Sequence, residues 1–288
     1  MGLSSSPSRL SELQANAKTM HLEVAACTDN GRIRPTNEDC YHVSREKNLF
    51  VLSDGMGGAA KGEVASGMAV EVVSGCFEQD AFVAISREGE LNSEFSDETN
   101  LLIRAIQMAN RRIHEEGTRD PASRGMGATI VAARISGNGL SLAHVGDSRA
   151  YLLRAQTLQQ LTSDHSLVAE QVRQGLMTDQ QAAVSELQSV LTRALGMEES
   201  VEVDADEMEL FPGDSLLLCS DGLTRMVPEH EISGILSRYP DVHIAAERLV
   251  ERANECGGHD NITVVIVRAS KPKGWFARFF PWGSANLA

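Results

Sequence analysis

The sequence has few aromatic residues, few basic residues and no long apolar run, and each shortage argues against a class of protein. Aromatic residues make up 5% of the 288 positions. The 26 lysines and arginines stand against 40 aspartates and glutamates, a formal net charge of −14, so the chain lacks the basic surface that binds nucleic acid. No run approaches the roughly 20 apolar residues that span a membrane. We therefore expect a soluble protein with no nucleic-acid partner.

Cysteine is also sparse. The five cysteines are odd in number, and no two of them form a C-x-x-C pair. Neither a disulfide framework nor a zinc site is therefore indicated, and a reducing, cytoplasmic location is expected. The 42% of hydrophobic residues is enough to form a sizeable core.

The spacing of apolar residues predicts helices over 62–77, after Ser96, and over 230–239 and 243–255. Ser96 is a suitable N-cap residue, and the helix after it has an apolar stripe at Leu102, Ile106, Ala109 and Ile113. Strands are predicted at 21–27, 40–44, 48–54, 127–136, 140–147, 149–154, 157–162, 215–221 and 262–268. Helices and strands both occur in pairs, which favours a layered α+β domain over a parallel βαβ fold. Consecutive strands over 127–162 are expected to form an antiparallel meander.

The chain divides into one domain and two tails. The domain is placed at 21–268 and includes a polar, helix-prone surface insertion at 163–190. The tail at 1–20 lacks the apolar core of a signal peptide and is expected to be disordered. The tail at 269–288 contains both tryptophans, Trp275 and Trp282, among other aromatic and basic residues. It is too short to span a bilayer, so it packs on its own domain, docks on a partner or rests at a membrane surface.

Five aspartates stand next to apolar runs, where strands leave or enter the core: Asp39, Asp54, Asp147, Asp221 and Asp260. Two of these strand ends repeat one design, because "FVLSDGMGG" and "LLLCSDG" each pass from an apolar run into Ser-Asp-Gly. Any single Asp-Gly is most often only a turn. Several carboxylates gathered at one sheet edge would repel one another, however, and would need a cation. All-oxygen ligation suits Mg²⁺ or Mn²⁺, and such ions support phosphoryl hydrolysis.

The ordered set of motifs resembles the metal-dependent PPM serine/threonine phosphatases, the protein phosphatase 2C type, in their bacterial form. The motifs are "RPTNED", "SDGMGGAAKGEVAS", "GMGATIVAA", "AHVGDSRAYLL", "LTSDHS", "LTRALG", "LCSDGL" and "GHDNITVVIV". The resemblance spans nearly all of residues 23–268. It implies an α+β, four-layer αββα sandwich, in which two mainly antiparallel sheets are flanked by helices and 163–190 is the flap.

The resemblance also implies roles for the acidic residues. Asp54 would bridge two metal ions, Mn²⁺ or Mg²⁺, and the carbonyl of Gly55 would ligate one of them. Asp39, Asp221 and Asp260 would hold the second ion, with Glu38 acting through a water molecule. Asp147 would help to bind a third, weaker ion together with Asp221.

The implied activity is hydrolysis of phosphoserine and phosphothreonine in proteins, by direct attack of a metal-activated water and without a phosphoenzyme. Arg34 would seat the phosphate, because its planar guanidinium can grip two phosphate oxygens at once. The implied partners are phosphorylated proteins, including a bacterial serine/threonine kinase and its substrates.

The sequence departs from the family where a proton donor is expected. Animal-type relatives have a histidine where this chain has Met56, and many bacterial relatives have one where it has Ala59. Metal-bound water is therefore the first candidate for the general acid, and His165 is a weaker one. His144, inside an apolar strand, is expected to be structural.

Two alternatives stay open at this point. The chain could be a catalytically inactive pseudophosphatase scaffold. It could also be a cysteine-dependent phosphatase, because Cys219 and Arg225 have C-x-x-G-x-x-R spacing, although Pro228 and the residue after Arg225 fit that motif poorly.

Overall fold

The computed structural model describes residues 20–57, 59–78 and 92–271. Nearly all of the predicted N-terminal tail, and Trp275 and Trp282 of the C-terminal tail, lie outside the described residues. None of the helices within those three ranges is long and apolar enough to cross a bilayer.

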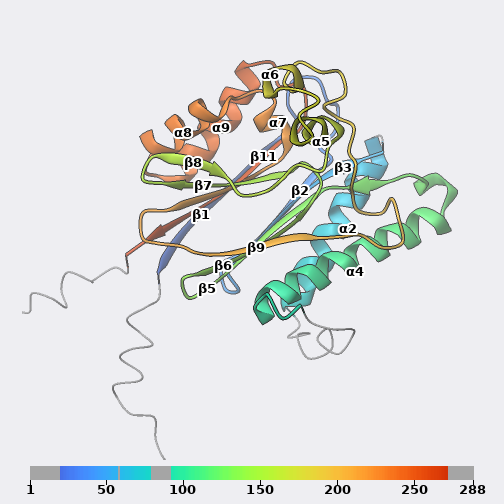
Figure 1. Ribbon diagram of the computed structural model, residues 1–288, viewed down its shortest axis with the longest axis horizontal. Helices are drawn as coiled ribbons and strands as arrows, with labels where there is room; N and C mark the ends of the chain where they lie inside the picture. The colour runs from blue at the N-terminus through green and yellow to red at the C-terminus, as the bar shows by residue number, and fades with distance from the viewer. Residues whose placement is uncertain (1–19, 58, 79–91, 272–288) are drawn as a thin grey trace, which may run out of the picture.

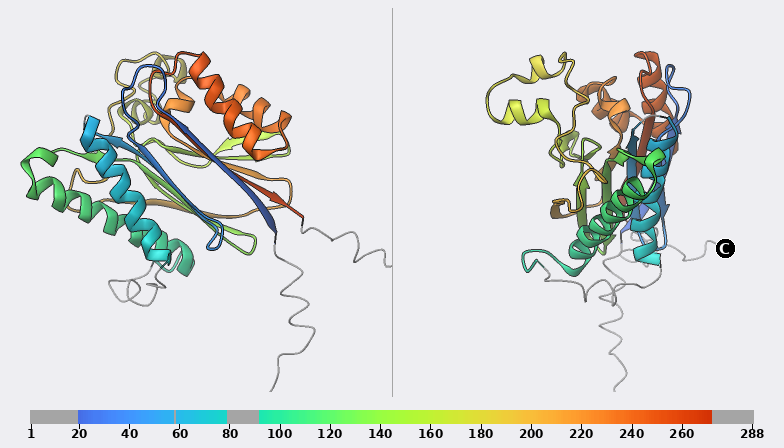
Figure 2. Two further views of the ribbon diagram at one scale, coloured as in Figure 1. Left: turned by 180° about the vertical axis from the view of Figure 1, so that it is seen from behind. Right: turned by 90° about the vertical axis from the view of Figure 1, so that its right-hand side faces the viewer.

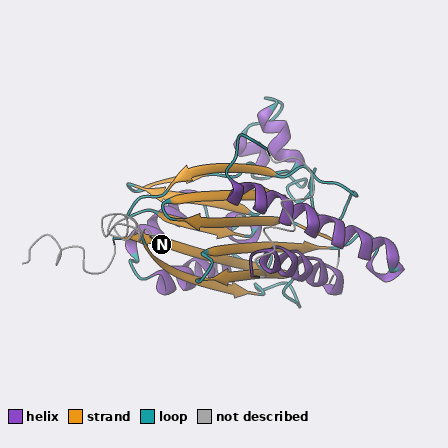
Figure 3. Ribbon diagram, turned by 90° about the horizontal axis from the view of Figure 1, so that it is seen from below, coloured by secondary structure: helices purple, strands orange, loops and turns teal. Residues whose placement is uncertain are grey.

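Two antiparallel β-sheets pack face to face (Figure 1). The first sheet has the order β1 (His21–Asp29), β11 (Ile262–Ser270), β10 (Ser215–Cys219), β7 (Arg149–Arg154) and β8 (Thr157–Gln160). The second has the order β2 (Asp39–Ser44), β3 (Leu49–Met56), β5 (Ile130–Ser136), β6 (Gly139–Val145) and β9 (Asp204–Glu209), with β4 (Gly127–Ala128) paired to β3. Figure 3 shows the strands running side by side through the body of the molecule.

A pair of helices covers the outer face of each sheet (Figure 1). The second sheet is covered by α2 (Ala59–Glu78) and α4 (Asp97–Arg119), and the first by α8 (Glu229–Arg238) and α9 (Val242–Glu255). The shorter helices are η1 (Pro121–Ser123), α5 (Leu167–Arg173), α6 (Asp179–Ala182) and α7 (Asp221–Thr224). The predicted four-layer α+β sandwich is confirmed.

The core has three layers because successive side chains of a strand point to opposite faces of its sheet. In β3, Leu49 and Val51 pack beneath α2 and α4, whereas Phe50 and Leu52 pack between the two sheets. All four are fully buried. The long apolar run in β3 is therefore that of a strand covered on both faces.

The helix predicted after Ser96 forms as expected. The Ser96 hydroxyl accepts a hydrogen bond from the Thr99 backbone N–H at 3.3 Å, which caps the first turn of α4. The predicted stripe from Leu102 to Ile113 is fully buried against α2 and the second sheet. A cap of this kind stabilises a helix by about 1 kcal/mol.

The predicted meander over 127–162 is wrong at one step. β5 pairs with β6 and β7 pairs with β8, but β6 and β7 belong to different sheets. The turn between them contains Gly146, whose φ of 104° lies in a region that favours glycine. A Gly-Asp-Ser turn between two apolar strands can either close a hairpin or carry the chain to the other sheet, so the local pattern does not distinguish them.

The segment 163–190 contains α5, α6 and turns, and it projects outward from the sandwich (Figure 2). Its two ends are joined, because the Leu167 N–H donates to the Val190 carbonyl at 2.8 Å and Ser166 forms a bridge with Leu191. Leu176 and Val184 are 72% and 81% exposed, so large apolar side chains of this segment face solvent.

Candidate metal centre

Two of the predicted aspartates face each other across neighbouring strands. Asp39 is the first residue of β2, and the strand register places it directly opposite Asp54 near the end of β3. Like charges in such cross-strand positions destabilise a sheet. The pairing needs a compensating cation if both carboxyl groups are ionised.

Asp221 joins this pair from the other sheet. It is the first residue of α7, which begins directly after β10 and Ser220. The Asp54 carboxyl group influences the pKa of Asp221, so the two side chains lie near each other. The Ser220 hydroxyl donates to Asp39 Oδ2 at 2.8 Å. The two sheets therefore meet at their acidic strand ends, as the repeated Ser-Asp-Gly design predicts.

Asp260 lies just before β11 and is paired with Arg34, the residue predicted to bind the phosphate. We call Asp39, Asp54, Asp221 and Asp260 the acidic cluster. Arg34 Nη2 donates to Asp260 Oδ2 at 2.9 Å, while the Arg34 side chain keeps 48% of its surface exposed. A guanidinium that is half exposed and tied to a carboxylate of the cluster can also reach an incoming anion.

Glu38 is buried beside the cluster. Its backbone N–H donates to Asn261 Oδ1 at 2.8 Å, and its carbonyl accepts from the Ser66 hydroxyl of α2 at 2.6 Å. Its side chain lies against Gly62, where an added Cβ would be 2.7 Å from Glu38 Oε2. The start of α2 therefore closes over the carboxyl group of Glu38.

The glycines of the two Ser-Asp-Gly turns are required by close packing. A Cβ on Gly55 would lie 2.0 Å from the Gly62 carbonyl oxygen, and one on Gly222 would lie 2.0 Å from the Asn261 carbonyl oxygen. No side chain fits at such distances. The repeated glycine thus lets each acidic turn approach a neighbouring backbone segment.

The electrostatics of the cluster favour cation binding. Burial, with smaller contributions from the neighbouring aspartates, raises the pKa of Asp39 to about 7 and the pKa of Asp54 well above its ordinary value. Burial also raises the pKa of Asp221. Among the described residues, none forms a hydrogen bond with Glu38 Oε1, Asp39 Oδ1 or Asp221 Oδ1. Buried carboxylate oxygens without donors, in an all-oxygen set, fit hard divalent cations.

Arg225 is the main feature of the site that the sequence did not predict. Its Nη2 lies 2.6 Å from Asp221 Oδ2 and 3.4 Å from Asp147 Oδ2. It therefore links the cluster to Asp147, whose pKa is raised to about 7, first by burial and then by Asp221. The four-residue spacing from Asp221 to Arg225 was the available signal, since such residues are neighbours on a helical turn.

The structure disfavours the cysteine-dependent alternative. Cys219 is fully buried in the apolar layer beneath α8 and α9. Burial raises its thiol pKa to about 12, so a thiolate does not form near neutral pH. Arg225 is bound to acidic side chains and does not form a phosphate cradle with Cys219.

The two histidines are both buried and hydrogen-bonded. His144 Nε2 contacts the Ser163 carbonyl at 2.9 Å, as expected for a structural residue. His165 Nδ1 accepts from the Gly146 N–H at 3.0 Å, and its Nε2 contacts Asp204. These contacts and the burial of the ring argue against His165 as a proton donor to substrate.

Comparisons with known proteins agree with this geometry. Residues 34–260 match the family model described as Protein phosphatase 2C. The serine/threonine phosphatase stp of Listeria welshimeri is 41% identical over 251 residues, which cover 86% of this chain and 95% of the relative. The crystal structure of the Mycobacterium tuberculosis serine/threonine phosphatase PstP/Ppp superposes with a TM-score of 0.76 at 36% identity, covering 86% of this chain and 99% of that one.

A further solved structure is the catalytic domain of the serine/threonine protein phosphatase PstP in complex with two manganese ions. It has a TM-score of 0.72 and 35% identity to this chain, and covers 88% of this chain and 100% of the other. The fold, the ordered motifs and these similarities agree, and the chain belongs to the protein phosphatase 2C family.

Proposed function

We propose that the chain hydrolyses phosphoserine and phosphothreonine in proteins at a centre for two Mn²⁺ or Mg²⁺ ions. The observation that carries this proposal is the convergence of buried carboxyl groups from both sheets, with oxygens that lack hydrogen-bond donors among the described residues. The relatives named as serine/threonine phosphatases, and the relative bound to manganese, support it.

The proposed ligands follow the placement of the strand ends. Asp54 lies near Asp221 and opposite Asp39, so we propose that it would hold both ions, with the Gly55 carbonyl as a further ligand of one of them. Asp39, Asp221 and Asp260 are proposed to hold the second ion. When bound, the ions supply Lewis acidity, which activates water near neutral pH and offsets charge that develops on the phosphoryl group.

Two further carboxyl groups complete the proposed centre. Glu38 is proposed to act through a water molecule, and its Oε1, buried without a donor among the described residues, supports this role. Asp147 is proposed to bind a third, weaker ion with Asp221, and Arg225 contacts both of these aspartates. In the absence of that ion the guanidinium supplies the opposite charge.

The chain's own residues seat the substrate and border its path. Arg34 is proposed to bind the phosphate while it keeps its ion pair with Asp260. A pocket of about 720 Å³ lies beside Asp147 and Arg225, and flap residues such as Val168 and Gln188 line it. We propose that this flap wall influences which phosphoprotein is accepted. Met56 cannot donate a proton, so a water molecule is the proposed donor to the leaving alcohol.

The proposed partners are proteins phosphorylated by a bacterial serine/threonine kinase, and the kinase itself. The relatives named as phosphatases support phosphorylated proteins as substrates, whereas the kinase is proposed from the family resemblance alone. The cytoplasmic location expected from the unpaired cysteines fits such substrates. We also propose that the C-terminal tail docks on its own domain, on a partner or at a membrane surface. Residues 272–288 of this tail lie outside the described structure.

Metal removal tests the proposal against both alternatives. We expect hydrolysis of p-nitrophenyl phosphate and of a phosphothreonine peptide with Mn²⁺, and loss of both in EDTA. The Cys219→Ser variant should retain most activity, because the thiol is buried in the core and takes no part in the reaction. Activity in EDTA that disappears in Cys219→Ser would establish the thiolate mechanism instead. A folded protein that binds Mn²⁺ without hydrolysing either substrate would be a scaffold.

Replacement of Arg34 tests the phosphate seat. We expect Arg34→Ala to lower kcat/KM by roughly 10- to 100-fold, because hydrogen bonds to charged groups contribute about 1.5–3 kcal/mol. Arg34→Lys should recover only part of this loss, since an ammonium lacks the planar fork. The exposed Arg112 of α4 provides a matched Arg→Ala control, for which no change is expected. An equal loss in both variants would contradict the assignment.

A further inference from the structure

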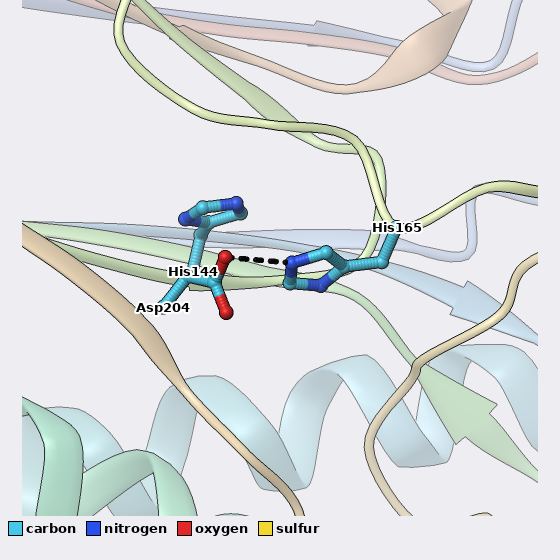
Figure 4. Close-up of side chains that lie close together, drawn as sticks. All are labelled: His144, His165 and Asp204. Carbon is cyan, nitrogen blue, oxygen red and sulfur yellow. Dashed lines mark ion pairs between the residues drawn. The ribbon is translucent and has the colours of Figure 1, made fainter. Parts of the chain in front are cut away.

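A second group of titratable side chains lies apart from the metal centre. His144 of β6, His165 just before α5 and Asp204 at the start of β9 gather at one place (Figure 4). Their potential ligand atoms all lie within 4.8 Å of one another. Both histidines are buried, and the mechanism described above does not use them. We call this group the His-His-Asp cluster.

The geometry of the His-His-Asp cluster does not favour a metal ion. The two imidazole rings are stacked, with centroids 4.9 Å apart and planes 18° from parallel. The lone pairs of imidazole lie in the ring plane, so those of stacked rings do not converge on one ion. Arg193 also supplies a cation there, because its Nη1 donates to Asp204 Oδ1 and lies 3.1 Å from His165 Nε2.

His165 instead connects the cluster to the turn that crosses between the sheets. The Gly146 backbone N–H donates to His165 Nδ1 at 3.0 Å. The backbone N–H of His165 donates in return to the Gly146 carbonyl at 3.0 Å. Because Nδ1 accepts, Nε2 carries the proton and can donate to Asp204 Oδ2, 3.2 Å away. Burial lowers the pKa of His165, which keeps the ring neutral and able to accept.

The same residue joins the two ends of the flap. The Thr192 N–H donates to the His165 carbonyl at 2.9 Å, and Arg193 follows directly in the chain. His165 thus lies at the start of the flap and Arg193 three residues after its end, and both contact Asp204. The base of the flap is fixed by this contact with β9.

The turn held by His165 carries Asp147 and packs against Thr129, which is hydrogen-bonded to Asp54. A Cβ on Gly146 would lie 2.7 Å from the Thr129 side chain, so the turn packs tightly there. The Thr129 hydroxyl oxygen accepts from the Asp54 N–H at 3.0 Å and lies 2.7 Å from the Ser148 hydroxyl. Movement of the turn would displace Asp147 and disturb the support of Asp54.

We propose that His165, oriented by Asp204 and Arg193, is a positioning residue that fixes the Gly146–Asp147 turn to the base of the flap, so that Asp147 is held for metal binding. The proposal rests on the third-ion role of Asp147 given above. It predicts that the flap and the weakest metal site are mechanically coupled through one imidazole ring.

Two amide replacements separate the contacts of the ring. In His165→Asn the amide oxygen can take the place of Nδ1 and accept from the Gly146 N–H, whereas the contact with Asp204 is lost. In His165→Gln the amide reaches the position of Nε2, and the acceptor for Gly146 is lost. Mn²⁺ titration by calorimetry, with Asp147→Asn as the reference, reports each ion directly and does not depend on turnover.

We expect Asp147→Asn to remove the weakest Mn²⁺ binding step. His165→Gln should weaken that step by roughly 10-fold or more, as loss of a group that orients a metal ligand commonly does, and His165→Asn should stay within about threefold of wild type. The tighter steps should change little in either histidine variant. If His165→Gln does not fold, His165→Leu, which also removes the acceptor for the Gly146 N–H, should weaken the same step by roughly 10-fold or more.

The outcomes distinguish the third-ion role of Asp147 from the positioning role of His165. If Asp147→Asn keeps all binding steps, the third-ion role of Asp147 is wrong, and the positioning role falls with it. If Asp147→Asn removes the weak step but His165→Gln leaves it unchanged, only the positioning role is wrong. Equal weakening of all steps in His165→Asn and His165→Gln, with equal loss of thermal stability, would show that His165 is merely structural and would overturn the inference.

Discussion

Replacement of Asp54 by asparagine is expected to abolish turnover while making the metal-free protein more stable. We expect kcat to fall by roughly 1,000-fold or more, which corresponds to about 4 kcal/mol of lost transition-state stabilisation. The reason is that Asp54 lies opposite Asp39 and near Asp221, where we propose that its carboxylate would bridge two ions. An amide offers one neutral oxygen in place of two charged ones.

The gain in stability has a separate physical cause. Burial, followed by repulsion from Asp39 and Asp221, raises the pKa of Asp54 well above its ordinary value. Without metal at neutral pH, folding must therefore either protonate this group or bury its charge, and both are unfavourable. Asparagine has nearly the same shape and removes that penalty.

Calorimetry in EDTA, together with the phosphatase assay in Mn²⁺, measures both effects on one variant. Asp206→Asn on β9 is the matched control, because Asp206 is exposed and lies outside the acidic cluster. The Asp206→Asn variant should change neither the turnover in Mn²⁺ nor the thermal stability in EDTA. A loss of turnover together with a lower melting temperature for Asp54→Asn would mean that the variant is misfolded rather than deprived of a ligand, and would contradict the account.

Most helices and strands, and the acidic residues of the candidate site, could be predicted from the sequence. Ser96 and the stripe from Leu102 to Ile113 predict α4, because a capping side chain and a 3.6-residue period act within one element. The two Ser-Asp-Gly turns predict that Asp54 and Asp221 meet at one end of the sandwich. The first inference needs only neighbouring residues, whereas the second also needs the sandwich fold that the family resemblance implies.

Pairing between distant segments accounts for what local sequence missed. The step from β6 to β7 crosses between sheets, and the Gly146 turn looks the same in sequence as a hairpin turn. Arg225 pairs with Asp147 from 78 residues away, and the link depends on where that crossing places Asp147. Cys219 has the spacing of a reactive thiol, yet strand alternation turns it into the core beneath α8.

The stability of the metal-free protein is expected to fall as pH rises from about 4 to about 7. Asp39 and Asp147 have pKa values raised to about 7, mainly by burial, whereas an unfolded aspartate titrates near 3.9. Between these values the folded state binds more protons than the unfolded state, so the free energy of unfolding decreases with pH. Below about pH 4 both states are protonated, and the full stability is present.

The measurement compares wild type with Asp39→Asn by urea unfolding in EDTA at several pH values. His144 and His165, whose pKa values burial lowers, give a slope of opposite sign, and the comparison cancels it. The variant should gain on wild type by up to about 1.4 kcal/mol per pH unit within the window and show no further gain above it. Saturating Mn²⁺ should reverse the order, because bound ions stabilise a folded state that retains its carboxylate ligands. A difference between the two proteins that does not change with pH, with or without Mn²⁺, would show that Asp39 is not the charged, buried ligand that the centre requires.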